Sequence, residues 1–193
     1  MFMPELTMPQ AEAAHLRAAF AQARVILEYG SGGSTVIAAE LPEKTVFSVE
    51  SDVDWLENMR GYFAAQPPVA ALHLHHGDIG PTRDWGHPAD DTEFRRWPNY
   101  PNSVWDRDDF KNPDLVLIDG RFRVACFLTT LFRSTAPVTV LFDDYLDRKS
   151  YHAVEDLVKP SAMIGRMAQF DLMPMTIPAD RLGWIISRFH HAQ

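Results

Sequence analysis

A short run of glycines between a strand-like and a helix-like segment is the feature that most limits the folds open to this chain. The apolar run Val25–Tyr29 is typical of a buried strand and ends at Gly30-Ser31-Gly32-Gly33. A helix is predicted over Ser34–Glu40, and a second β-rich run follows at Thr45–Val49. Strand, tight turn, helix and strand in that order form a β-α-β unit, whose two strands lie parallel in one sheet. The chain should therefore contain a parallel sheet covered by helices.

The rest of the chain continues this alternation. Further strands are predicted at Val69–His76, Asp114–Ile118 and Val138–Phe142, and further helices at 11–23, 51–65, 121–133 and 150–158. Two final β candidates, Met167–Leu172 and Leu182–Phe189, follow one another without a helix and should form an antiparallel pair. We therefore expect a single α/β domain over residues 1–193, with a doubly wound, mainly parallel seven-stranded sheet, helices on both faces and an antiparallel C-terminal strand pair.

Two helix starts carry capping signals. Thr7 and Gln10 have capping-box spacing at the start of a helical N-terminal extension, residues 1–24. Ser51 and Asp54 are similarly placed to cap the helix that follows the second strand. We expect these residues to cap the two helices.

Residues 80–113 interrupt the regular pattern. This segment holds five prolines and three of the five tryptophans, and only a short helix near Ser103–Phe110 is predicted inside it. A long connection without clear periodicity is usually functional or mobile. Its aromatic residues could line a substrate pocket, hold the irregular segment together or form a contact in a homodimer; they are Trp85, Trp97, Tyr100 and Trp105.

Composition narrows the classes of partner. A formal charge of −8 opposes binding to a phosphate backbone, so we expect a small-molecule partner and no nucleic acid. No apolar run approaches the roughly 18 residues that a membrane span needs, so no membrane partner is expected. The single cysteine, Cys126, cannot form an intramolecular disulfide, and no basic cluster followed by an apolar stretch stands near Met1. These features predict a cytoplasmic protein.

The glycines predict a nucleotide-like ligand. Glycines between a strand and a helix let a ligand approach the backbone and the free N–H groups of the helix. A dinucleotide fingerprint requires a third small residue where this chain has Thr35, and no lysine follows the glycines as a phosphate-binding P-loop requires. Glu50, at the end of the second strand, could accept both hydroxyl protons of a ribose, and Asp78, after the third strand, could meet an adenine amine.

Together these residues resemble the first three motifs of class I S-adenosylmethionine-dependent methyltransferases. The resemblance rests on Glu28-x-Gly30-x-Gly32, Glu50 and Gly77-Asp78, in the same order and at similar spacings. It implies a methyltransferase fold that binds S-adenosylmethionine, with Gly30, Ser31 and Gly32 against the methionine and ribose portion. By the same resemblance, Glu50 would hold the ribose hydroxyls, Asp78 would contact the adenine, and Glu28 would orient the loop or the amino group of the ligand.

Acidic residues also follow the next two strands. Asp119 closes the fourth predicted strand, and Asp143-Asp144 closes the fifth. This arrangement is similar to the metal-dependent O-methyltransferases of the catechol and macrocin type, and it implies that Asp119, Asp143 and Asp144 bind Mg²⁺. Asp119 and Asp144 would then be the catalytic candidates. Alternatively, Asp119 only orients the methionine end of the cofactor or caps a helix, and the Asp143-Asp144 pair only turns the chain into the next helix.

The chain departs from the macrocin pattern after Asp119. Those enzymes carry a further acid there, whereas this chain has Arg121 and Arg123, and arginine cannot act as a base at neutral pH. These arginines could pair with the carboxylates, removing the need for a metal, or bind an acidic substrate. The sequence therefore predicts an S-adenosylmethionine-dependent methyltransferase with a small-molecule acceptor, through O-methylation if the double-Asp resemblance holds. A noncatalytic cofactor-binding module and an NAD-dependent oxidoreductase remain as alternatives.

Overall fold

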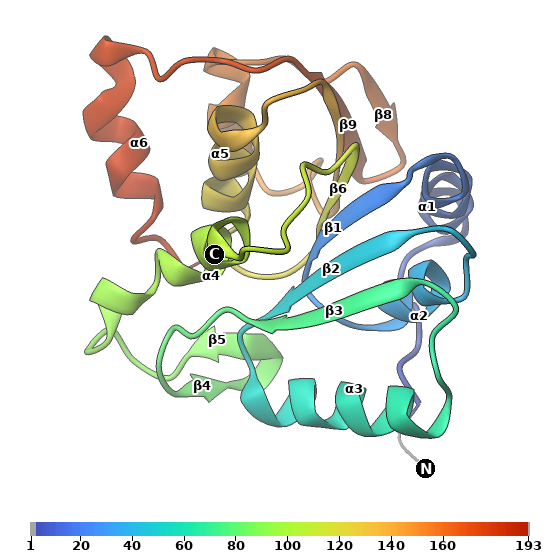
Figure 1. The fold of residues 1–193 in the computed structure, drawn as a ribbon. Coiled ribbons are helices and arrows are strands. Elements are labelled where there is room, and N and C mark those ends of the chain that lie inside the picture. The colour runs from blue at the N-terminus through green and yellow to red at the C-terminus, as the bar shows by residue number, and fades with distance from the viewer. Residues whose placement is uncertain (1–2, 193) are drawn as a thin grey trace.

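The computed structural model describes residues 3–192, and its centre is one seven-stranded sheet (Figure 1). The strand order is β3-β2-β1-β6-β7-β9-β8. The first five strands in this order run parallel, and β9 pairs antiparallel with both β7 and β8. The strands are β1 (Val25–Tyr29), β2 (Thr45–Glu50), β3 (Ala71–His76), β6 (Leu115–Ile118), β7 (Val138–Phe142), β8 (Ala162–Ile164) and β9 (Met167–Leu172). The doubly wound, mainly parallel sheet expected from the sequence is confirmed.

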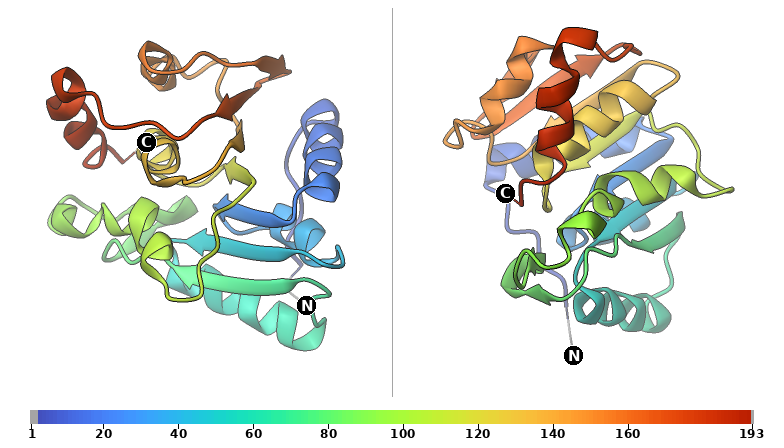
Figure 2. Two further views of the ribbon diagram at one scale, coloured as in Figure 1. Left: turned by 45° about the horizontal axis from the view of Figure 1, so that its top comes forward. Right: turned by 90° about the vertical axis from the view of Figure 1, so that its left-hand side faces the viewer.

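Helices cover both faces of the sheet (Figure 2). The apolar residues of β1 and β6 alternate between two separate cores, one on each face of the sheet. One core contains α1 (Gln10–Gln22) and α2 (Gly33–Ala39), and the opposite core contains α5 (Arg123–Arg133) and α6 (Leu182–Arg188). A further helix, α3 (Val53–Ala65), contacts β2 and β3. Among the described residues, no helix is long and apolar enough to cross a membrane.

The segment 80–113 packs against the sheet instead of extending from it. It contains a small hairpin of β4 (Thr82–Arg83) and β5 (His87–Pro88), the short helix α4 (Asn99–Asn102) and several 3-10 turns, one of them at Ser103–Asp106. Three of its aromatic residues are buried, whereas Trp85 at the tip of the hairpin is 84% exposed. The buried aromatic residues belong to the larger core; they are Trp97, Tyr100 and Trp105.

The C-terminal strand pair differs from the expected one. The run Leu182–Phe189, predicted as a strand, forms α6, and the partner of β9 is β8, which the sequence analysis missed. Trp184, Ile185 and Phe189 pack against the core, and this spacing follows the period of a helix. A short apolar run is compatible with the period of a strand and with that of a helix, and in α6 the packing against the core selects the helix.

Three other local predictions were wrong. The helix α1 begins at Gln10 without the Thr7 cap, because the residue before Pro9 is driven toward extended backbone. The helix α3 is capped by Asp52, whose carboxylate accepts a hydrogen bond from Trp55 N at 3.0 Å, and not by Ser51. A 3-10 helix at Tyr151–Asp156 replaces the α-helix predicted over 150–158.

Candidate functional site

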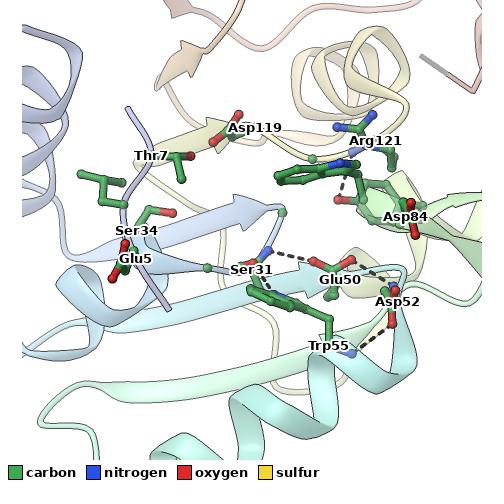
Figure 3. A pocket seen from close by; sticks show the side chains of 18 residues that line it. Glu5, Thr7, Ser31, Ser34, Glu50, Asp52, Trp55, Asp84, Asp119 and Arg121 are labelled. Atoms are coloured by element: carbon green, nitrogen blue, oxygen red, sulfur yellow. Dashed lines mark hydrogen bonds between the residues drawn. The ribbon is translucent and has the colours of Figure 1, made fainter. Parts of the chain in front are cut away.

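A cavity of about 450 Å³ opens at the carboxyl ends of the central strands. In Figure 3, Asp119 and Arg121 lie on one side of it, and Glu50 and Trp55 lie on the other. Six parts of the chain contribute its wall: the N-terminal segment 5–7, the glycine loop 30–34, the region 50–55, the hairpin tip 84–86, Tyr100 of α4, and the turn 119–121. The site therefore lies where open parallel sheets bind ligands.

The glycine loop has one crowded and one open position. Gly30 has a φ of +102°, and a Cβ there would lie 2.7 Å from the backbone N of Gly120. Gly32, in contrast, has an extended φ of 178°, and a Cβ there would meet nothing within 4 Å. Gly30 is thus required by the close approach of two backbone turns, whereas Gly32 leaves space beside the cavity.

Glu28 is hydrogen-bonded to the residues at the end of the glycine loop. Its carboxylate is fully buried and accepts hydrogen bonds from the hydroxyl groups of Ser34, Thr35 and Ser48. Burial raises the pKa of Glu28 to about 7, because the charged form loses its hydration. Glu28 does not line the cavity, and its hydrogen bonds with Ser34 and Thr35 tie it to the start of α2.

Glu50 joins the end of β2 to the glycine loop. Its Oε2 accepts a hydrogen bond from Ser31 N at 3.2 Å, while its Oε1 accepts hydrogen bonds from Ser51 N at 2.7 Å and Asp52 N at 3.0 Å. Burial raises the pKa of Glu50, and the three backbone donors counteract part of this shift. Since Oε2 accepts from only one donor among the described residues, it has a second acceptor position for a ligand hydroxyl.

Trp55 and the hairpin complete this side of the cavity. The indole Nε1 of Trp55 donates to Ser31 O at 2.8 Å and so fixes the glycine loop from the helix α3. The hairpin tip is tied to β2 because Ser51 Oγ donates to Gly86 O at 2.9 Å. The wall therefore depends on contacts between segments that are remote in the sequence.

Asp78 is not brought into the cavity. It forms an ion pair with Arg96, and its carboxylate also accepts a hydrogen bond from Gly80 N. Asp84, in the hairpin tip, lines the cavity instead. The predicted adenine contact of Asp78 thus has no support in this arrangement.

The three acidic residues predicted as metal ligands do come together. Asp119, Asp143 and Asp144 each offer an oxygen within 4.8 Å of the others, but arginines already bind them. Arg166 binds both oxygens of Asp143, at 3.2 and 2.7 Å. The buried Arg123 lies 3.2 Å from Asp119 and 3.2 Å from Asp144.

A magnesium ion fits this cluster poorly. Magnesium requires near-octahedral oxygen ligation, and the carboxylate oxygens that would supply it accept hydrogen bonds from guanidinium groups. Arg148 adds a third positive charge 3.2 Å from Asp144, which would repel a divalent cation. The pairing of arginine with these carboxylates, which the sequence left open, is therefore realised by Arg123, with Arg148 and Arg166 as further partners.

Of the three acids, only Asp119 lines the cavity. Its side chain is 27% exposed, and burial together with the nearby Asp143 and Asp144 raises its pKa to about 7, although Arg123 acts in the opposite direction. A carboxylate with such a pKa can exchange a proton near neutral pH. Asp144, the second catalytic candidate, is held by Arg123, Arg148 and Arg166 and does not line the cavity.

Several lining residues were not anticipated. The segment 5–7 belongs to the predicted N-terminal extension, and it packs so closely that a Cβ on Gly33 would lie 2.2 Å from Leu6 N. Trp55 lies on a helix whose amphipathic pattern gives no sign of a ligand site. Of the aromatic residues in segment 80–113, Trp85 and Tyr100 line the cavity, as one of the alternatives predicted.

Comparison with known proteins places this fold in a family. No protein-family model matches the chain, and a search of curated proteins gives no match either. Among solved structures, a methyltransferase-like protein from Silicibacter pomeroyi is 52% identical, with 97% of this chain and 98% of that chain covered and a TM-score of 0.94.

Two more distant structures share the fold. The O-methyltransferase TomG from Streptomyces achromogenes, involved in tomaymycin synthesis and solved with S-adenosylmethionine, is 23% identical over 81% of this chain and 63% of that chain, with a TM-score of 0.51. An O-methyltransferase from Bacillus cereus, solved with S-adenosylhomocysteine, is 15% identical over 81% and 66% of the two chains, with a TM-score of 0.54. The chain therefore belongs to the family of the Silicibacter methyltransferase-like protein and has the class I methyltransferase fold that its sequence motifs predicted.

Proposed function

We propose that this protein binds S-adenosylmethionine in the cavity and transfers its methyl group to a small molecule, with an oxygen atom as the acceptor. The observation that carries the proposal is the junction of Glu50 with the glycine loop at the carboxyl end of the sheet. Membership of the methyltransferase-like family supports it. The two O-methyltransferases that share the fold were solved with S-adenosylmethionine or its demethylated product, which favours the same ligand here.

The lining residues suit such a ligand. The free acceptor position of Glu50 Oε2 can take a hydrogen bond from a ribose hydroxyl. Gly32 leaves room for the ligand beside the loop, and Glu28 fixes the loop from the opposite side. Asp119 lies across the cavity from Glu50, where its carboxylate can attract the ammonium group or the sulfonium of the cofactor (Figure 3).

The chain then has a limited chemical task. S-adenosylmethionine supplies an electrophilic methyl group on a sulfonium sulfur. The protein must hold an acceptor atom in line with that methyl group, and such alignment is itself a large source of rate enhancement. Asp119, with its raised pKa, is the cavity residue suited to take the proton from a hydroxyl acceptor.

Isothermal titration calorimetry tests the proposal. S-adenosylhomocysteine should bind saturably to the purified protein, and NAD should give no binding heat. NAD binding without S-adenosylhomocysteine binding would overturn the proposal in favour of an oxidoreductase.

A matched pair of variants tests the predicted ribose contact. Glu50→Gln should weaken S-adenosylhomocysteine binding by about 1–3 kcal/mol, because a buried charged acceptor is lost. Glu57→Gln, on the exposed surface of α3, changes the net charge equally and should leave the affinity unchanged. Equal affinities for the two variants would remove Glu50 from the ligand site.

A further inference from the structure

Arg121 lines the cavity and has N–H groups that no described residue uses. Its Nη1 donates to His87 Nε2 at 2.7 Å, and no other side-chain hydrogen bond of this guanidinium occurs among the described residues. The Nε atom is buried and lacks any partner in residues 3–192. Nη2 also has no partner among the described residues but is not enclosed, so it can donate a charge-assisted hydrogen bond to a carboxylate.

The charge of Arg121 is also unmatched. The neighbouring arginines 123, 148 and 166 each lie within 3.2 Å of an aspartate oxygen, whereas in the described part of the chain Arg121 has no ion-pair partner. His87 cannot neutralise it, because a histidine nitrogen that accepts from a guanidinium belongs to a neutral ring. A half-buried guanidinium without a counter-ion is unfavourable, and a bound anion would relieve it.

A second residue of the cavity wall has a strained backbone. Trp85 lines the same cavity with a φ of +64°, a left-handed conformation that is an outlier for a bulky side chain. Its indole is 84% exposed, so burial of the ring does not explain the strain. Backbone strain of this kind is concentrated at sites that clamp ligands. An exposed aromatic ring and an unpaired cation in the wall of one cavity suit a ligand with one anionic and one apolar part.

We propose that Arg121 binds a carboxylate group of the methyl acceptor through its Nη2 atom, so that the acceptor is a small hydroxy acid whose apolar part lies against Trp85. This inference rests on the proposed methyltransferase function and names its substrate class. Asp119, two residues before Arg121, lines the same cavity and would face the hydroxyl group to be methylated. Arg121 thus selects acidic acceptors over neutral ones.

The carboxylate of S-adenosylmethionine itself is the competing partner for Arg121. The two cases differ in what the loss of Arg121 affects. If Arg121 binds the acceptor, its replacement leaves the affinity for S-adenosylhomocysteine unchanged. If Arg121 binds the cofactor, its replacement weakens that affinity.

The test is calorimetry on protein saturated with S-adenosylhomocysteine. The probes are 4-hydroxybenzoate and 3-hydroxybutyrate, each compared with its neutral amide. At least one acid should bind about tenfold or more tightly than its amide, as expected for a charge-assisted hydrogen bond. Arg121→Met should abolish that preference, Arg121→Lys should restore part of it, and the surface control Arg60→Met should retain it fully.

Each remaining outcome is decisive. Equal binding of acids and amides, no binding of either acid, or an unchanged preference in Arg121→Met would overturn the inference. A loss of S-adenosylhomocysteine affinity in Arg121→Met and not in Arg60→Met would assign Arg121 to the cofactor carboxylate and also overturn it. If S-adenosylhomocysteine fails to bind the unmodified protein, the proposed function itself fails, and this first titration separates the two cases.

Discussion

The Nη2 atom of Arg123 lies 3.2 Å from a carboxylate oxygen of Asp119. The same atom lies 3.2 Å from Asp144, and other donors of this side chain reach Gly120 O and Asp143 O. One buried arginine therefore connects the ends of β6 and β7, where the sequence predicted a magnesium site. Guanidinium groups therefore stabilise this part of the site.

Replacing Arg123 should strongly destabilise the fold. Its side chain is only 3% exposed, so Arg123→Met leaves two largely buried carboxylates without their shared partner. We expect the free energy of unfolding to fall by about 3–5 kcal/mol in urea denaturation. Arg181→Met breaks an exposed ion pair with Asp156 and should cost about 1 kcal/mol or less. Similar losses in the two variants would contradict the role assigned to Arg123.

Magnesium should not stabilise the protein. A metal bound to the folded state at a hundred times its Kd would raise the free energy of unfolding by about 2.7 kcal/mol. Because guanidinium groups already bind the carboxylates, we expect the Tm in millimolar magnesium to equal that in EDTA. A rise in Tm with magnesium concentration that disappears in Asp143→Asn would show that the ion displaces the arginines.

The two loop glycines should respond differently to alanine. Gly30→Ala forces a side chain into the left-handed region and against the backbone of Gly120, so the Tm should fall by several degrees. Gly32→Ala meets no protein atom, so its Tm should change little while its affinity for S-adenosylhomocysteine falls. Thermal unfolding and calorimetry on both variants check this contrast. Full affinity in Gly32→Ala would place the ligand elsewhere.

Glu28 should make the stability depend on pH. Its pKa is raised from 4.5 to about 7 in the folded state, so between these values the folded protein holds more protons than the unfolded chain. Stability contributed by Glu28 is therefore present below pH 4.5, is lost as the pH rises toward 7 and stays constant above it.

The variant Glu28→Gln removes this dependence. Relative to the unmodified protein, it should gain stability between pH 5 and pH 8, by up to about 3 kcal/mol for a shift of this size. Urea denaturation of both proteins at the two pH values measures the difference. A difference that is the same at both pH values would mean that Glu28 titrates normally in the fold.

The sequence predicted best the parts that local pattern determines. The strands β1 and β7 were predicted to the residue, because a short, largely apolar run between turns leaves few alternatives. Gly30 and Glu50 were placed correctly because the β-α-β unit brings the ends of its two strands together. In α6, the apolar run is compatible with a strand and with a helix, and only its packing against the core selects the helix.

Sequence patterns did not predict the ion pairs between residues that are far apart in the chain. Arg166 binds Asp143 from the turn between β8 and β9, and no local spacing indicates this contact. Likewise, Asp78 was expected in the cavity from its position after β3, but Arg96 of segment 80–113 binds it. The wall formed by segment 5–7 depends on how the N-terminal segment crosses Gly33, which again is a tertiary contact.

The central claim is that Glu50 and the glycine loop bind the adenosyl part of S-adenosylmethionine, and a crystal structure of the complex with S-adenosylhomocysteine tests it most directly. The account predicts ligand density in the cavity, with a ribose hydroxyl about 2.6–3.2 Å from the Glu50 carboxylate. Ligand density outside the cavity, or a ribose that contacts neither Glu50 nor the glycine loop, would contradict it.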